Sequence, residues 1–91
     1  MIKDMTNNTL PMSMLEINQE AVIMSVSDEC EIKRRLYELG FVPGTVVRCV
    51  LRAPLGDPKA FEVKNTLVSV RREESRYISV LRKDDAQNTK K

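Results

Sequence analysis

The chain has 91 residues, which is enough for one small domain with a limited hydrophobic core. Its formal net charge is +2, from 15 basic and 13 acidic residues, so it lacks the strong positive field of a dedicated nucleic-acid binder. It has no histidine, which excludes most catalytic and transition-metal sites, and no apolar run near the roughly 18 residues that a membrane span needs.

The hydrophobic core is expected to be aliphatic, since 42% of the residues are hydrophobic but only 4% are aromatic, and tryptophan is absent. Cys30 and Cys49 form no CxxC pair, so they are predicted to be buried apolar residues rather than a disulfide or a metal pair. The N-terminus has no basic segment followed by a long apolar core. No signal peptide is therefore predicted, and a cytoplasmic location is expected.

Both ends of the chain are predicted to lie outside the folded domain. Residues 1–12 are polar without a period, which predicts a mobile N-terminal arm. Residues 83–91 are too polar to bury a surface and are predicted to be a disordered, charged tail. The folded domain is therefore predicted over residues 13–82, with its first strand over residues 21–26, where β-branched and apolar side chains gather.

A short helix is predicted to follow this strand. Ser27 or Asp28 can cap its N-terminus, and Asp28 with Glu31 forms a capping-box pattern. The basic residues 33–35 lie in later turns, where the helix dipole favours positive charge.

The helix is predicted to end at a glycine. Leu36 and Leu39 share one helix face, and Gly40 follows as a left-handed C-cap. Pro43 and Gly44 then predict the centre of a type II turn that leads into a strand.

The longest strand is predicted over residues 45–53, with Val47, Cys49 and Leu51 on one face. The loop after it contains two prolines, which cannot donate to a sheet. Its Leu55 either folds back on the core or stays exposed for a partner, and the sequence leaves both open.

The second half of the domain is predicted to be a hairpin followed by one more strand. Residues 60–64 and 67–71 alternate as strands around a turn at residues 65–66. Residues 72–76 fit a single helical turn, and residues 77–81 form the last strand. Five short strands with one inserted helix predict a mainly β fold, a small closed barrel.

Several short motifs in this order resemble the FeoA family, small cytoplasmic proteins of bacterial ferrous-iron uptake. The resemblance covers residues 14–81. It rests on the motifs Arg34-Arg35-Leu36, Leu39-Gly40-Phe41-Val42-Pro43-Gly44-Thr45, Ala53-Pro54-Leu55-Gly56-Asp57-Pro58, Val68-Ser69-Val70-Arg71 and Ile78-Ser79-Val80. It implies an SH3-like five-stranded barrel with a helix after the first strand and a short helical turn before the last.

The chemistry of the sequence favours a binding module over an enzyme. There is no glycine-rich phosphate loop, no nucleophile elbow and no carboxylate pair with an evident role, so no catalytic residue, cofactor or small-molecule substrate is predicted. The FeoA resemblance implies a protein partner, the large Fe(II) membrane transporter with a GTP-binding cytoplasmic domain, FeoB-like. The predicted function is to bind and modulate this transporter at the inner face of the membrane.

The predicted partner-binding surface combines apolar side chains with a charged rim. The apolar part consists of Leu39, Phe41, Val42 and Leu55, and the rim consists of Arg34, Arg35 and Tyr37.

Alternative functions stay open at this point. Accessory domains of iron-dependent repressors are similar to this chain, so a regulatory or nucleic-acid-associated SH3-like module is the second candidate, although the low net charge argues against it. Direct Fe(II) binding by Asp57 or Glu62 would need three hard oxygen ligands, which no sequence cluster supplies, so no metal site is predicted. The sequence also leaves self-association open.

Overall fold

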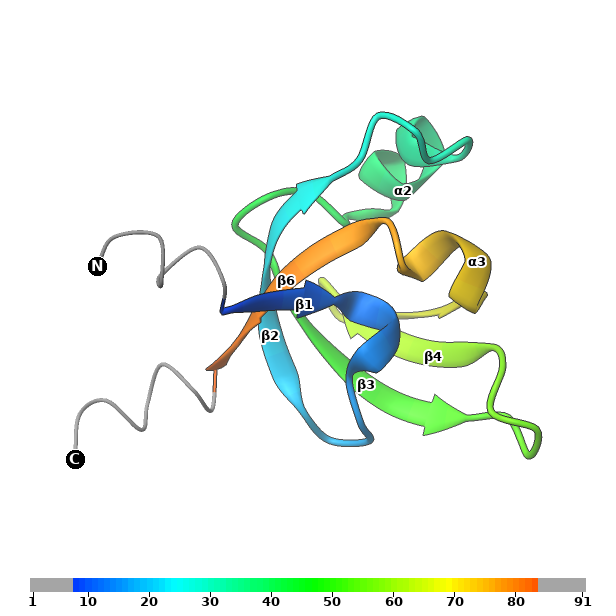
Figure 1. Ribbon diagram of the computed structural model, residues 1–91. Coiled ribbons are helices and arrows are strands. Elements are labelled where there is room, and N and C mark those ends of the chain that lie inside the picture. Colours follow the sequence, from blue (N-terminus) through cyan, green and yellow to red (C-terminus); the bar gives the residue numbers. More distant parts are fainter. Residues whose placement is uncertain (1–7, 84–91) are drawn as a thin grey trace, which may run out of the picture.

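The computed structural model describes residues 8–83, which form one curved antiparallel sheet with short helices at its margins (Figure 1). The mainly β prediction is confirmed, with six strands rather than five in the order β1-β6-β2-β3-β4-β5. The strands are β1 (Thr9–Pro11), β2 (Glu20–Val26), β3 (Val46–Arg52), β4 (Lys59–Val63), β5 (Thr66–Val70) and β6 (Ile78–Arg82). The helices are η1 (Met12–Met14), α2 (Lys33–Leu39) and α3 (Arg72–Ser75).

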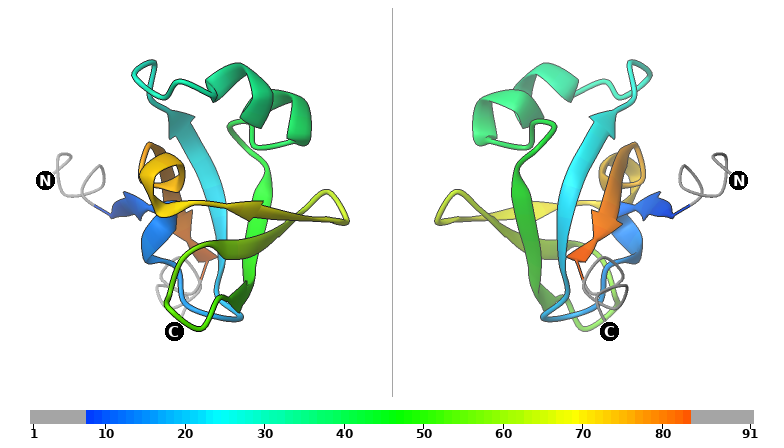
Figure 2. Two further views of the ribbon diagram at one scale, coloured as in Figure 1. Left: turned by 90° about the vertical axis from the view of Figure 1, so that its right-hand side faces the viewer. Right: turned by 90° about the vertical axis from the view of Figure 1, so that its left-hand side faces the viewer.

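The sheet bends around an aliphatic core. Figure 2 shows β2 and β3 running across the direction of β4 and β5, so that the sheet folds back on itself. The side chains between these strands are buried, and they include both phenylalanines and both cysteines. The largest fully buried side chains are Phe41, Phe61, Met12, Leu15, Ile23, Leu36, Ile78, Val47, Val63 and Val80.

The expected N-terminal arm over residues 1–12 is wrong for its last four residues. Thr9–Pro11 forms β1 and pairs with β6, with Leu10 opposite Val80, and Met12 is fully buried. A three-residue strand is too short to show a period in the sequence, so only its pairing partner reveals it. Residues 1–7 and 84–91 lie outside the described residues, while Lys83, expected in the tail, pairs with Glu20 at 3.4 Å.

The predicted start of the helix is also wrong. The helix α2 begins at Lys33, and its N-cap residue Ile32 makes no side-chain cap hydrogen bond. Asp28 instead binds the Lys33 ammonium, which lowers the pKa of the Asp28 carboxyl. The Ser27 hydroxyl accepts the Glu29 N–H at 3.1 Å, so local side-chain contacts hold a turn where a first helical turn was expected.

The predicted end of the helix is confirmed. Gly40 has a φ of 113°, and the Phe41 N–H donates to the Leu36 carbonyl at 2.9 Å, as in a Schellman motif. Thr45 then donates its N–H to the Val42 carbonyl at 3.1 Å, which closes the predicted turn, with Gly44 at a φ of 93°. Residues 40–45 therefore reverse the direction of the chain between α2 and β3, and the Phe41 side chain is buried in the core.

One strand face differs from its prediction because of a β-bulge. Val47 and Cys49 are buried as predicted, but Leu51 is 56% exposed. The register between β3 and β4 shifts between Cys49 and Leu51, and an extra residue in one strand moves all later side chains to the opposite face. The hairpin turn is also displaced by one residue, since positive φ values of 51° and 64° place Lys64 and Asn65 at its centre.

Candidate docking surface

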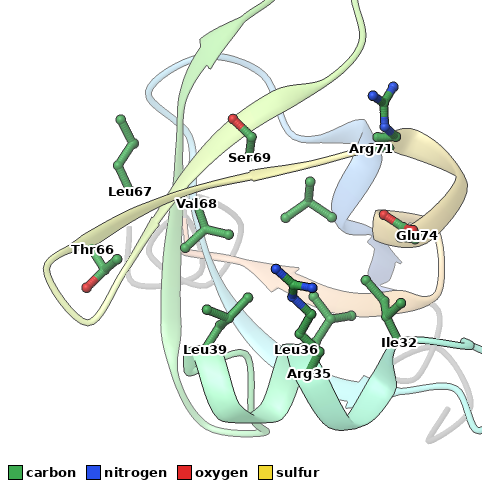
Figure 3. Close-up of a pocket in the computed structure, with 11 residues that line it drawn as sticks. Ile32, Arg35, Leu36, Leu39, Thr66, Leu67, Val68, Ser69, Arg71 and Glu74 are labelled. Atoms are coloured by element: carbon green, nitrogen blue, oxygen red, sulfur yellow. The ribbon is translucent and has the colours of Figure 1, made fainter.

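A groove of about 490 Å³ lies between α2 and the edge strand β5 (Figure 3). Residues of α2 and the residue before it form one wall, and β5 forms the other. Arg71 and Glu74 lie where β5 passes into α3. The groove has the size of a typical ligand or peptide site, but it lies open on the surface of a small domain.

The α2 wall follows from helical spacing. Ile32, Leu36 and Leu39 recur at helical intervals, and Figure 3 shows all three pointing towards β5. Leu36 is almost completely buried, whereas Ile32 and Leu39 are half-buried and pack against the core. The part of Ile32 and Leu39 that stays exposed makes the α2 wall of the groove apolar.

The β5 wall is lined by consecutive residues rather than by alternate ones. All of β5 and the following Arg71 line the groove, although Val68 points towards α2 and Leu67 points away from it (Figure 3). A groove on one face of a strand would be lined by every second residue, because successive side chains point to opposite faces. The groove therefore runs along the free edge of β5.

The rim of the groove carries more positive than negative charge. Arg35 and Arg71 are exposed and form no ion pair within residues 8–83, and Glu74 is half-buried. Arg34 does not line the groove. It approaches Glu38 at 3.9 Å, an exposed pair that stabilises the helix only slightly.

The predicted partner-binding residues do not form one surface in the structure. Arg35 and Leu39 both line the groove. Phe41 is fully buried in the core, so its predicted place on the exposed surface is wrong, and Val42 is half-buried. Tyr37 is partly exposed on α2, and its ring lies 5.6 Å from the Lys33 ammonium.

The question left open for Leu55 is answered by its exposure of 95%. The loop that carries it joins β3 and β4 and lies at the opposite end of the molecule from α2 (Figures 1 and 2). Leu55 is therefore exposed, but it does not line the groove.

The sequence interpretation missed Ile32 and the whole contribution of β5 to this groove. One signal was available, since Leu67 is an apolar residue that alternates with Val68 and so lies on the opposite face of its strand. It is 56% exposed in the structure. The missing information was the position of β5 at the edge of the sheet.

The carboxylates considered for Fe(II) have structural partners. Asp57 accepts the Arg72 N–H at 2.8 Å and so caps α3, and Glu62 pairs with Arg48 at 2.8 Å. Within residues 8–83 no group of three or more Cys, Asp or Glu side chains is arranged to hold a metal ion. In the same residues, the helices are all too short or too polar to cross a membrane.

Comparison with known proteins identifies relatives of this chain. The model of the FeoA domain family matches residues 10–86. A fusion of Fe(2+) transport protein A with the Fe(2+) transporter FeoB, from Porphyromonas gingivalis, is 36% identical over 69 residues, which are 76% of this chain. The chain spans only 8% of the length of that fusion protein.

Solved structures agree with the fold. The zinc complex of FeoA from Stenotrophomonas maltophilia, described as a prokaryotic SH3 domain protein, is 37% identical, with a TM-score of 0.67 over 76% of this chain and 86% of that one. A manganese-dependent transcriptional repressor has a TM-score of 0.73 over 81% of this chain and 41% of its own. At 12% identity the repressor shares only the fold. The fold is SH3-like, and the chain belongs to the FeoA domain family, which is linked to ferrous iron transport.

Proposed function

We propose that this chain binds the cytoplasmic part of an FeoB-type Fe(II) transporter, which carries a GTP-binding domain, and modulates its transport activity without catalysing a reaction. The observation that carries this proposal is the relative in which both proteins form one chain. Fusion holds two modules at a high effective concentration, which is useful where the separate modules must meet. The protein would then work in the cytoplasm, at the inner face of the membrane.

The groove between α2 and β5 is the surface that best suits such a partner. It combines an apolar wall at Ile32 and Leu39 with basic groups at its rim. This is the arrangement of a protein interface rather than of a catalytic pocket. A partner changes an equilibrium only through its different affinities for two states. We therefore expect the transporter's cytoplasmic domain to offer this chain a better contact in one of its states.

The test compares two matched double variants in binding to the purified transporter. Arg35→Glu with Leu67→Asp changes exposed side chains at the groove, and Arg52→Glu with Leu51→Asp makes the same changes on exposed positions of β3. We expect the groove variant to bind at least about tenfold more weakly, a loss of about 1.4 kcal/mol, and the β3 variant to bind like the wild type.

Two further measurements complete this test. Melting curves of both double variants show that they fold, and Leu55→Asp measures any second contact through the β3–β4 loop. Equal binding by the groove variant and the wild type would remove the groove as the contact surface. No binding by the wild-type chain would overturn the proposed function itself.

A further inference from the structure

The two edges of the sheet are protected very differently. One edge strand, β1, has three residues and ends in Pro11, which cannot donate a hydrogen bond. The other, β5, has five residues, Thr-Leu-Val-Ser-Val, and contains no charged residue, no proline and no register shift against β4. Exposed edges are normally blocked by such devices, because their unpaired backbone groups attract another strand.

The register shows which backbone groups of β5 are free. The two-residue turn makes Thr66 a hydrogen-bonded partner of Val63, and such pairs alternate along an antiparallel ladder. Val68 and Val70 therefore also direct their N–H and C=O groups to β4. Leu67 and Ser69 direct theirs to the open edge, where no strand within residues 8–83 pairs with them.

We propose that an extended segment of a partner protein binds along β5 as an additional strand of the sheet. The free backbone groups of Leu67 and Ser69 require a partner with its own backbone donors and acceptors at strand spacing, which a helix does not offer. The five residues of β5 span about 17 Å at about 3.3 Å per residue. A paired segment of about five residues therefore fits.

The groove specifies the side chains of that segment. An added strand presents alternate side chains to the apolar surface of Leu39 and Val68, so apolar residues are expected at every second position. Arg71 points away from α2, on the side that Leu67 and Ser69 share (Figure 3), and it forms no ion pair within residues 8–83, which favours acidic residues between the apolar ones. Glu74 lines the α3 end and disfavours a carboxylate there. The identity of the partner as the transporter rests on the proposed function, whereas the mode of binding does not.

The test measures amide hydrogen exchange by NMR on the full chain. The probes are nine-residue peptides with valine and glutamate at alternating positions, and the same peptides N-methylated at every second residue. We expect peptide binding to slow exchange of the Leu67 and Ser69 amides by at least about tenfold, while the Thr66, Val68 and Val70 amides, already paired with β4, change little. Methylation blocks the ladder only where the N–H faces β5, so of the two alternating sets, on the valines or on the glutamates, we expect one to abolish binding and the other to leave it.

A pair of variants separates the backbone from the side chain. Ser69→Pro removes one outward N–H without touching the pairing with β4, and edge strands accept proline at such a position. Ser69→Ala keeps this N–H. We expect Ser69→Pro to lose most of the peptide affinity and Ser69→Ala to keep it, with both variants folded as judged by their melting curves.

Several outcomes would overturn the proposal. These are no binding of any peptide at about 1 mM, equal binding by Ser69→Pro and Ser69→Ala, or methyl shifts at Leu39 and Val68 without slower exchange at Leu67 and Ser69. Protection of these two amides in the free chain, together with a dimer mass, would assign the edge to a second copy instead.

The same experiment with the transporter's cytoplasmic domain keeps the two proposals apart. Binding of that domain without protection of Leu67 and Ser69 would support the proposed function and refute pairing along β5. Protection by the peptides without any binding of the transporter would support pairing along β5 and refute the choice of partner.

Discussion

Replacement of Phe41 by alanine tests the main correction that the structure makes to the predicted surface. Phe41 has no exposed surface and belongs to the core, and truncation of a buried phenylalanine typically lowers the free energy of unfolding by about 3–5 kcal/mol. A domain of 91 residues is stable by about 5–14 kcal/mol, so this loss is a large share of the total. At about 4–8 °C per kcal/mol, the melting temperature of Phe41→Ala should fall by at least about 12 °C.

The matched control is Leu55→Ala, since both residues were expected on the same surface. Leu55 is 95% exposed, so its truncation should change the free energy of unfolding by no more than about 0.5 kcal/mol. Urea unfolding of both variants, followed by circular dichroism, measures the two values. A loss below about 1 kcal/mol for Phe41→Ala, or equal losses for both, would refute the assignment of Phe41 to the core.

Two further variants test the cap and the buried thiol. Asp57→Ala should lower the free energy of unfolding by about 0.5–2 kcal/mol, because it removes the acceptor for the Arg72 N–H. Asp57→Asn keeps an oxygen there and should lose less. Equal losses of stability by the two variants in urea unfolding would contradict the cap. Burial raises the pKa of the Cys49 thiol, so the folded state keeps its proton after the unfolded thiol has lost it, and stability is lost as pH rises from the unfolded pKa towards the folded one. Cys49→Val should therefore lose less stability between pH 7 and 10 than the wild type, and parallel curves would contradict this linkage.

The position of the groove has a consequence for any mutational study of this protein. Leu36 lines the groove and also belongs to the core, so its replacement would change folding and binding together. Arg35, Leu67 and Ser69 are exposed, and changes there report on binding with little effect on stability. Variants at these three positions are therefore the informative ones.

Local rules decided which parts of the fold could be predicted. Gly40, Pro43 and Gly44 each have a conformational preference that acts within a few residues, and the end of α2 and the turn after it were predicted correctly. The start of α2 was not, because Asp28 has two local options, a cap and an ion pair with Lys33, and the sequence does not rank them.

The candidate site was harder to predict than the fold. An apolar side chain next to a turn can enter the core or remain exposed. Phe41 and Leu55 are both large apolar residues beside a glycine, so the sequence does not tell which of them is buried. A Schellman hydrogen bond and the closing sheet carry Phe41 inward, while the long loop leaves Leu55 in solvent. The hydrogen bond is local, but the burial of Phe41 also depends on sheet strands that are distant in the chain.

The sequence alone determined that this protein is a small, mainly β domain without histidine, with one helix that ends at Gly40 and an ordered set of FeoA motifs. These properties follow from composition and from preferences that act over a few residues. Only the tertiary structure decided that β5 lies at an edge, that Leu51 faces outward after a bulge and that α2 lies beside β5. The physical reason is that strand order and register depend on pairing between distant segments, which no local preference specifies.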